Sequence, residues 1–210
     1  WWNGLYRVIA NANLALDKIP GITPMDEAQK NKFLGEAKFL RAWAYFYAVR
    51  LWGDIPLIST PQTANSEDFF PGRATQEDIY ALIVKDLTEA EAAGLPWMDA
   101  GGRVSLAAVK AQLARVYLTM AGQPLNKGAA YYTLAANKAK EGEVHHVNTE
   151  NKLEHLFELQ YLADVSGNPM ENMFPNFKPV SVYGANGTGS TVPTLSFYQS
   201  YEAGDLRAKD

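Results

Sequence analysis

The sequence of 210 residues contains no cysteine. Disulfide bridges, a thiol nucleophile and cysteine-ligated metal sites are therefore excluded within this chain. A run of the roughly 18 apolar residues that a membrane-spanning helix needs is also missing. Basic residues are not in excess, since 19 Lys and Arg stand against 23 Asp and Glu and the formal net charge is −4. Without a basic patch or tail, nucleic acid is not expected as a partner.

Motifs that would indicate catalysis, a bound metal or a cofactor are missing as well. His145 and His146 are adjacent and His155 follows nine residues later, whereas a helix presents two imidazoles to a metal at a spacing of four. The Gly-Thr-Gly-Ser run at 187–190 lacks the Lys and the following helix of a phosphate-binding loop. The scattered carboxylates do not select a pair for glycoside hydrolysis. We therefore predict no catalytic residue, metal or cofactor here, and leave open an acidic pair outside this chain.

Helical periodicity is abundant, above all in the stretch GEAKFLRAWAYFYAVRLWGDIPLI at 35–58. Apolar residues recur three and four apart on two stripes, which predicts a long helix over 24–52 that lies between other helices. We expect Thr23 to cap this helix and Gly53 to end it. Gly35 within it marks a place where another helix approaches closely. The stripes are Phe33, Ala37, Leu40, Ala44, Tyr47 and Leu51, and Phe39, Trp43, Phe46 and Trp52.

Four further helices are predicted on either side of this long helix. They cover residues 2–18, 75–94, 105–122 and 129–141, with a loop at 59–74. Thr75 with Asp78 is a capping box, and Ser105 begins the next helix. Asn13 is expected to bond the backbone of a neighbouring helix rather than a ligand. Residues 2–142 should thus be almost entirely helical, without a β-sheet, and the 24–52 helix should make the most interhelical contacts.

The predicted fold class is mainly α, with antiparallel helix pairs like those of tetratricopeptide repeats in an α/α superhelix, followed by a loop-rich irregular region. Segment 106–141 has the size of one repeat, and an offset of 69 residues relates Gly53 to Gly122, about two repeat periods. We place the helical scaffold at 1–142 and the loop-rich region, as the start of a ligand-binding part, at 143–210. The latter is expected to hold a short helix at 151–162, an edge strand at 173–177, an exposed loop at 180–193 and a weak helix at 194–202.

The stretch at 35–58 also resembles the signature of SusD/RagB-type proteins, in which Gly-Glu-Ala-basic-Phe-Leu-Arg-Ala precedes an aromatic run and Leu-aromatic-Gly-Asp-x-Pro-Leu. Gly102-Arg103-Val104-Ser105 and the run Leu113–Leu118 resemble a second common motif of this family. The resemblance covers at least residues 2–142. Family members are roughly twice as long or more, so the chain resembles an N-terminal-to-middle portion that lacks the lipidated N-terminus and the C-terminal half.

This resemblance implies a cell-surface lipoprotein on the extracellular face of the outer membrane of Bacteroidetes, which is not an enzyme. Such proteins bind a glycan or oligosaccharide, or in some members a peptide, and deliver it to a SusC-like TonB-dependent transporter. Membrane attachment would come only from a lipid anchor outside this chain. The physical pattern alone leaves an alternative open, namely a generic tetratricopeptide-type adaptor that binds a peptide or protein partner.

Three residues are candidates for ligand binding. Tyr183 and Asn186 lie in the predicted loop at 180–193, where an aromatic ring can stack on a sugar and an amide can both donate and accept hydrogen bonds. Trp97 lies in a Pro- and Gly-containing loop between two predicted helices. Its ring either offers a second stacking surface or covers the end of the helix pair, and the sequence leaves both alternatives open.

Overall fold

The protein is seen here in a computed structural model, which describes residues 1–63, 70–99 and 101–141. Within these ranges the chain forms five α-helices, one short 3₁₀ turn and two short strands. In chain order they are α1 (Trp2–Lys18), η1 (Ile19–Gly21), α2 (Glu27–Trp52), β1 (Ile55–Pro56), β2 (Arg73–Ala74), α3 (Gln76–Glu91), α4 (Leu106–Ala121) and α5 (Ala129–Glu141).

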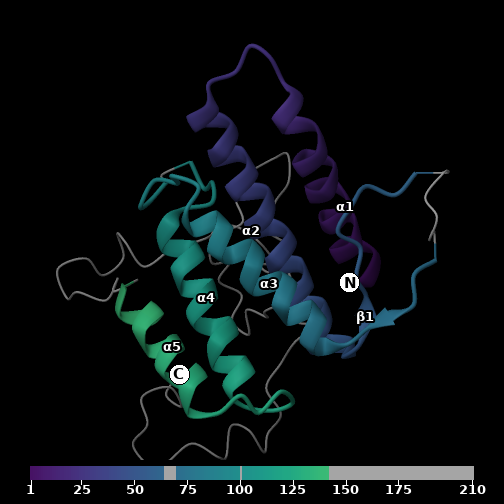
Figure 1. The fold of residues 1–210 in the computed structure, drawn as a ribbon, viewed down its shortest axis with the longest axis vertical. Coiled ribbons are helices and arrows are strands. Elements are labelled where there is room, and N and C mark those ends of the chain that lie inside the picture. The colour runs from purple at the N-terminus through teal and green to yellow at the C-terminus, as the bar shows by residue number, and fades with distance from the viewer. Residues whose placement is uncertain (64–69, 100, 142–210) are drawn as a thin grey trace, which may run out of the picture. The chain divides into compact units, whose positions relative to one another are not determined.

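Successive helices lie side by side and run in opposite directions (Figure 1). The long helix α2 packs against α1 on one side and α3 on the other, and it also touches α4. Helix α4 in turn packs against α3 and α5. The predicted mainly helical fold of antiparallel pairs is therefore confirmed, and α2 has the most extensive interhelical contacts, as its two apolar stripes predict.

The helix starts follow the predicted capping residues except at α2. Thr75 accepts a hydrogen bond from the backbone N–H of Asp78 at 3.2 Å, and Ser105 caps α4 in the same way. Helix α2, however, begins at Glu27, because the carboxylate of Asp26 accepts from the N–H of Gln29 at 3.2 Å. The prediction of a Thr23 cap is wrong by three residues, since Asp is as good a cap as Thr and lies closer to the apolar stripes.

A two-residue antiparallel ladder joins β1 to β2, so the expectation of no sheet in this range is wrong. The ladder pairs Ile55 with Ala74 and Pro56 with Arg73. Its cause is the turn after α2, where Gly53 adopts a left-handed φ of 72° and sends the chain back toward the helices. The side chain of Ile55 is then fully buried. The ladder closes the connection between α2 and α3 at its base.

The core is built from the predicted stripes of α2, but the stripes do not stay buried to their ends. Phe39 and Phe46 are fully buried and Trp43 is partly buried against the core. Leu51 and Trp52, at the last turn, are 57% and 40% exposed, which contradicts their assignment to a buried face. The ring of Trp52 instead packs edge-on against the ring of Trp2 at the start of α1, at a centroid distance of 5.0 Å.

Gly35 lies at a close approach of α2 to the end of α3, as its position in the sequence suggested. A Cβ atom added at Gly35 would lie 2.5 Å from the Cβ of Ala93. Real side chains do not tolerate such a distance. Helix α3 ends at Glu91, three residues before the predicted end, and the chain then turns through Gly94 with a φ of 72°. The small residues on both sides therefore let α2 and α3 pack closely.

The outer helices are held by four alternating charges, which we call the outer ion cluster: Glu91 of α3, Lys110 of α4, and Lys138 and Glu141 of α5. Lys110 reaches Glu91 at 2.6 Å and Glu141 at 2.5 Å, and Lys138 reaches them at 2.8 and 3.0 Å. Each cation thus bridges two carboxylates from different helices.

The predictions for 143–210, which include a short helix at 151–162, an edge strand at 173–177 and a loop at 180–193, lie outside the described residues. The division of the chain near 142 accordingly stays a prediction.

Candidate functional site

A buried ion pair crosses the centre of the helical part. The guanidinium of Arg41 on α2 donates two hydrogen bonds to the carboxylate of Asp86 on α3, at 2.7 and 2.8 Å. The side chains are 7% and 0% exposed, respectively. Burying two charges is favourable only when the geometry is good and the remaining donors are satisfied. The bidentate pairing meets the first condition, and the next contacts meet the second.

Arg41 and Asn13 together hold the segment that follows β1. The third nitrogen of Arg41, Nη1, donates to the side-chain oxygen of Asn13 at 2.7 Å and to the carbonyl of Ser59 at 2.9 Å. The amide of Asn13 donates to the carbonyls of Ile58 at 2.9 Å and Thr60 at 3.3 Å. Asn13 therefore bonds backbone, as predicted, but the backbone belongs to an irregular segment and not to a helix.

Two tyrosines also form hydrogen bonds to residues 56–60, which we call the pinned segment. The hydroxyl of Tyr45 donates to the carbonyl of Ile58 at 2.9 Å and accepts from its N–H at 2.7 Å. The hydroxyl of Tyr6 donates to the carbonyl of Pro56 at 2.7 Å. Burial raises the pKa of Tyr45 to about 12, so the hydroxyl stays a neutral donor at ordinary pH. Side chains of α1 and α2 thus fix where the chain leaves the helices toward residues 61–72.

The sequence contains a pattern that indicates this network, although the apolar stripes of α2 alone did not predict it. Arg41 interrupts the apolar pattern of α2, and Asp86 lies among the apolar residues Ile83 and Leu87 on the buried side of α3. A charge on each of two predicted buried faces indicates a buried pair, because a lone buried charge is too costly.

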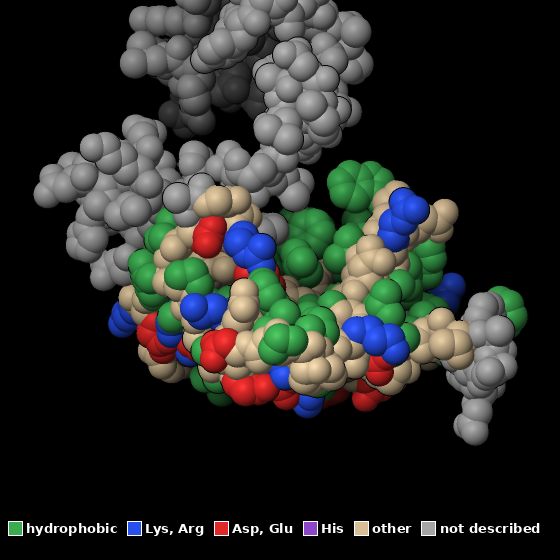
Figure 2. All heavy atoms as spheres, turned by 90° about the horizontal axis from the view of Figure 1, so that it is seen from above, with side chains coloured by type: hydrophobic (Ala, Val, Ile, Leu, Met, Phe, Trp, Pro, Cys, Tyr) green, Lys and Arg blue, Asp and Glu red, His purple; other side chains and the backbone are tan. Residues whose placement is uncertain are grey.

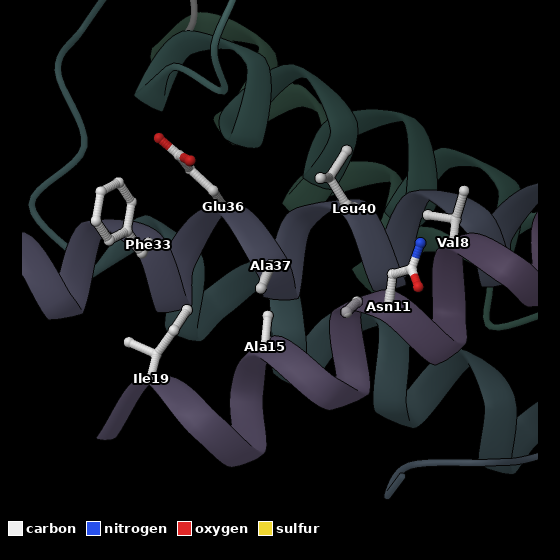
Figure 3. Close-up of a pocket in the computed structure, with 9 residues that line it drawn as sticks. Val8, Asn11, Ala15, Ile19, Phe33, Glu36, Ala37 and Leu40 are labelled. Atoms are coloured by element: carbon white, nitrogen blue, oxygen red, sulfur yellow. The ribbon is translucent and has the colours of Figure 1, made fainter. Parts of the chain in front are cut away.

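A groove of about 450 Å³ lies between α1 and α2. Figure 3 shows Val8 and Ala15 of α1 facing Ala37 and Leu40 of α2 across it, with Phe33 and Ile19 toward one end. Its lining is almost entirely apolar, and the two polar side chains are Asn11 and Glu36. Such a lining suits aliphatic or aromatic side chains better than a sugar, whose hydroxyls need several polar partners.

The connection between α3 and α4 contacts two residues that line this groove, Phe33 and Glu36. Arg103 in that connection donates to both carboxylate oxygens of Glu36, at 2.9 and 2.5 Å. Its guanidinium also lies 5.3 Å from the ring centroid of Phe33. An arginine that stacks on a ring and binds a carboxylate in the same place is held in one orientation. Glu36 is therefore committed to Arg103 and is not available to a ligand.

Trp97 belongs to the same connection and keeps 45% of its surface exposed. Its carbonyl accepts from the N–H of Ala107 at 3.2 Å, and the nearby Asp99 carboxylate accepts from the N–H groups of Gly101 and Arg103. The backbone around Trp97 is therefore ordered while half of the indole remains accessible. Tyr183 and Asn186, the other two candidates, lie outside the described residues, so their place in a ligand site stays a prediction.

Charged side chains and possible metal ligands of the described residues do not indicate a further site. On the face shown in Figure 2, basic and acidic side chains are interspersed with hydrophobic ones. Among residues 1–63, 70–99 and 101–141, the structure contains no group of three or more His, Asp or Glu side chains that could hold a metal ion. No helix in these ranges is both long and apolar enough to cross a membrane.

Comparison with known proteins places this helical architecture in one family. A family model described as starch-binding and associating with the outer membrane matches residues 1–118. A SusD-like protein of Formosa agariphila is 32% identical over 178 residues, which cover 79% of this chain and 32% of that protein. A SusD-like protein of Bacteroides ovatus is 35% identical over 123 residues, 58% of this chain and 22% of that protein.

Solved structures agree with the sequence comparisons. The crystal structure of a SusD superfamily protein from Parabacteroides distasonis has a TM-score of 0.88 and 36% identity, and the match covers 100% of this chain and 47% of that one. A laminarin-binding SusD-like protein gives a TM-score of 0.59 at 33% identity, with 67% of this chain and 29% of that chain covered. A structure described with xylogluco-oligosaccharide gives 0.77 at 26% identity, with 96% and 44% covered.

This chain therefore spans less than half the length of the relatives that it matches. The family model covers more than half of the chain, and the predicted resemblance is confirmed. On these matches and on its antiparallel helical scaffold, the chain belongs to the SusD-like family.

Proposed function

We propose that the chain is the helical scaffold and the adjoining part of a cell-surface protein that binds an oligosaccharide and delivers it to a SusC-like TonB-dependent transporter. The match of residues 1–118 to a family described as starch-binding and outer-membrane-associated carries the proposal. Structural relatives that bind laminarin or are described with xylogluco-oligosaccharide support a carbohydrate as the ligand. The protein would lie on the extracellular face of the outer membrane through a lipid anchor outside this chain.

The chemistry of the described surface supports a division of labour between scaffold and ligand site. The groove between α1 and α2 is apolar and its Glu36 is paired, so it offers little to sugar hydroxyls. We propose that the oligosaccharide is bound by residues beyond the helices, with Tyr183 stacking on a sugar ring and Asn186 bonding its hydroxyls. Trp97 is proposed as an additional stacking surface, because its indole is half exposed on an ordered backbone.

No catalytic role is proposed for this chain. Among the residues that the structure describes, several acidic side chains form ion pairs, such as Asp86 with Arg41 and Glu36 with Arg103. A glycosidase needs two carboxylates facing one cleft at a defined separation. Asp86 and Glu91 of this scaffold instead join neighbouring helices through their ion pairs.

Calorimetry with a panel of oligosaccharides, using the full-length protein, tests the proposal. We expect binding to at least one glycan, and we expect Tyr183→Ala to weaken it by a few-fold to about tenfold, the range that one stacking contact supplies. Asn151→Ala, a polar change outside the proposed loop, serves as the matched control. A full panel without binding would contradict the ligand class, while unchanged affinity in Tyr183→Ala would move the site elsewhere. Copurification of a TonB-dependent transporter with the tagged protein tests the delivery partner.

A second candidate is an adaptor that binds a peptide or protein partner. The apolar groove between α1 and α2 favours it, since such a groove accepts the side chains of a helix or an extended peptide. The substitution Ala37→Glu would fill this groove with a charge. If partner binding fails in Ala37→Glu while glycan binding is retained, the groove serves a protein partner and the carbohydrate site is separate from it.

A further inference from the structure

Two arginines on neighbouring helices lie against one buried aromatic ring. The guanidinium carbon of Arg50, in the last turn of α2, is 5.0 Å from the ring centroid of Phe46, and that of Arg115 on α4 is 5.6 Å from the same centroid. Both arginines are exposed, while Phe46 is fully buried. Two positive charges are therefore held close together where α2 and α4 meet.

Two partly buried aromatic rings of α2 adjoin these charges. The ring centroid of Tyr47 lies 5.7 Å from the guanidinium carbon of Arg115, and the centroids of Trp43 and Tyr47 are 4.7 Å apart. We call the surface formed by Trp43, Tyr47, Arg50 and Arg115 the arginine–aromatic face. It combines flat apolar area with two cations.

Neither arginine of this face forms an ion pair within the part of the chain that the structure describes, whereas Arg103 does. The guanidinium of Arg103 lies 5.3 Å from the ring centroid of Phe33 and also donates to both carboxylate oxygens of Glu36. An arginine that stacks on a ring thus keeps its N–H donors available to a carboxylate. The arginine–aromatic face has the rings and the guanidinium groups of this arrangement without the carboxylate.

A third donor on the same side of α4 also lacks an acceptor. Arg115 contacts rings of α2, so its side of α4 faces α2, and Gln112 lies one turn earlier on that side because residues three apart are neighbours on a helix. Gln112 is 7% exposed, and its amide nitrogen has no hydrogen-bond partner among the described residues. Since an unsatisfied buried donor costs stability, an acceptor that arrives with a ligand is favourable here.

The size of the face favours a small anionic group over a protein partner. Its residues on α2 run from Trp43 to Arg50, about 10 Å along the axis at the standard rise. A stable protein interface buries about 800 Å² on each partner, which is much more than a strip of this length offers. The strip is instead suited to a sugar unit that carries a charge.

We propose that the arginine–aromatic face binds an acidic sugar, a uronic acid unit of an oligosaccharide. Arg50 and Arg115 donate to the carboxylate oxygens, as guanidinium groups do in charge-assisted pairs, and the rings of Trp43 and Tyr47 cover the apolar face of the sugar. The inference rests on the proposed function, because it takes the ligand to be a carbohydrate, and it adds the acidic class. It uses none of the residues proposed above for sugar binding, Tyr183, Asn186 and Trp97.

Calorimetry on the full-length protein tests the proposal with a panel of uronic acid oligosaccharides, each paired with its methyl ester. The ester keeps the sugar and removes the charge, so this comparison needs no variant. We expect at least one acid to bind about tenfold more tightly than its ester, because each exposed arginine–carboxylate pair contributes a few-fold. Raising the salt concentration should weaken binding of the acid and leave binding of the ester unchanged.

Variants then assign the preference to the face. Arg50→Gln/Arg115→Gln should abolish the preference for the acid, and Arg50→Lys/Arg115→Lys should retain part of it because the charges remain. Arg7→Gln, at an exposed position of α1, is the matched control and should leave the preference unchanged. Urea denaturation of each variant checks that it is folded.

The outcomes separate this inference from the proposed function. Equal binding of acid and ester in every pair would overturn the inference, and so would a preference that survives Arg50→Gln/Arg115→Gln in a folded protein; binding of a neutral glycan in either case would leave the proposed function standing. Absence of binding to every glycan, neutral or acidic, would overturn both. A peptide of glutamic acid residues is the last probe. If it binds through the two arginines while no uronic acid oligosaccharide does, the face serves an acidic protein partner and the inference is wrong.

Discussion

The buried pair of Arg41 and Asp86 gives a quantitative expectation for stability. Asp86→Ala removes an acceptor of two hydrogen bonds and leaves the guanidinium of Arg41 buried, with side-chain exposures of 7% and 0% before the change. Breaking such a pair by removing one partner costs about 3–5 kcal/mol. Arg41→Met should cost at least as much, because it also takes a donor from Asn13 and from the Ser59 carbonyl.

The double variant Arg41→Met/Asp86→Ala separates the pair from its surroundings. The penalty for an unpaired buried charge is present in each single variant and absent from the double variant. We therefore expect the two single losses to exceed the double loss by about 2 kcal/mol or more, within the range of coupling for contacting residues. Urea denaturation followed by far-UV circular dichroism measures all three free energies of unfolding.

A matched exposed pair provides the control for this experiment. Arg103→Met breaks the pairing with Glu36, but the side chain of Arg103 is 52% exposed, so its loss should be at most about 1 kcal/mol. If Asp86→Ala lowered the free energy of unfolding no more than Arg103→Met does, the Arg41–Asp86 pair would not be buried in solution. The conclusion that Arg41 holds the pinned segment would then be wrong.

Three further predictions concern the packing and the pH dependence of the helical part. Phe39→Ala should lower the free energy of unfolding by about 3–5 kcal/mol because Phe39 is fully buried. Trp43→Ala should lower it by less because Trp43 is only partly buried. A loss below about 1 kcal/mol for Phe39→Ala would exclude Phe39 from the core. Gly35→Ala should destabilise by about 1–3 kcal/mol through its contact with Ala93, and the compensating Gly35→Ala/Ala93→Gly should recover most of this; equal stability of both variants would contradict the close approach. In the outer ion cluster, burial alone would raise the pKa of Glu91, but the hydrogen bonds from its two lysines outweigh burial and lower it below the ordinary value of 4.5. A lowered pKa contributes stability that is present above pH 4.5 and is lost as the pH falls through the folded-state pKa. In acid titrations followed by circular dichroism, the wild type should therefore lose more stability than Glu91→Gln. Parallel stability curves of the two proteins would refute the lowered pKa of Glu91.

Helix positions followed from the sequence because each depended on local chemistry. Thr75 and Ser105 predicted two starts correctly, since a capping side chain acts within three residues of itself. The start of α2 was placed wrongly because Thr23 and Asp26 are both suitable caps, and local preference does not choose between them. The exposed ends of the α2 stripes could not be predicted either, because burial depends on how far a neighbouring helix extends.

The candidate site was less accessible to sequence reasoning. The bonds of Arg41 join residues 28 and 45 positions away in the sequence, and such long-range pairing has no periodic signature. The groove between α1 and α2 likewise results from small side chains, Ala12, Ala15 and Ala37, that face each other only after folding. Trp97 could be singled out from the sequence because it is an aromatic in a connection that contains Gly and Pro, and its exposure of 45% agrees with a surface position, but its role in ligand binding stays a prediction.

The pinned segment has a consequence for how this scaffold accommodates variation. The β1–β2 ladder and the side chains of Tyr6, Asn13 and Tyr45 hold both ends of the connection between α2 and α3. When the two ends of a loop are already fixed by the surrounding protein, doubling the loop's length adds only about 0.6 kcal/mol of closure entropy. Insertions between the pinned segment and β2 are therefore expected to leave the packing of α1, α2 and α3 as it is, because the contacts that fix the two ends do not depend on the length between them.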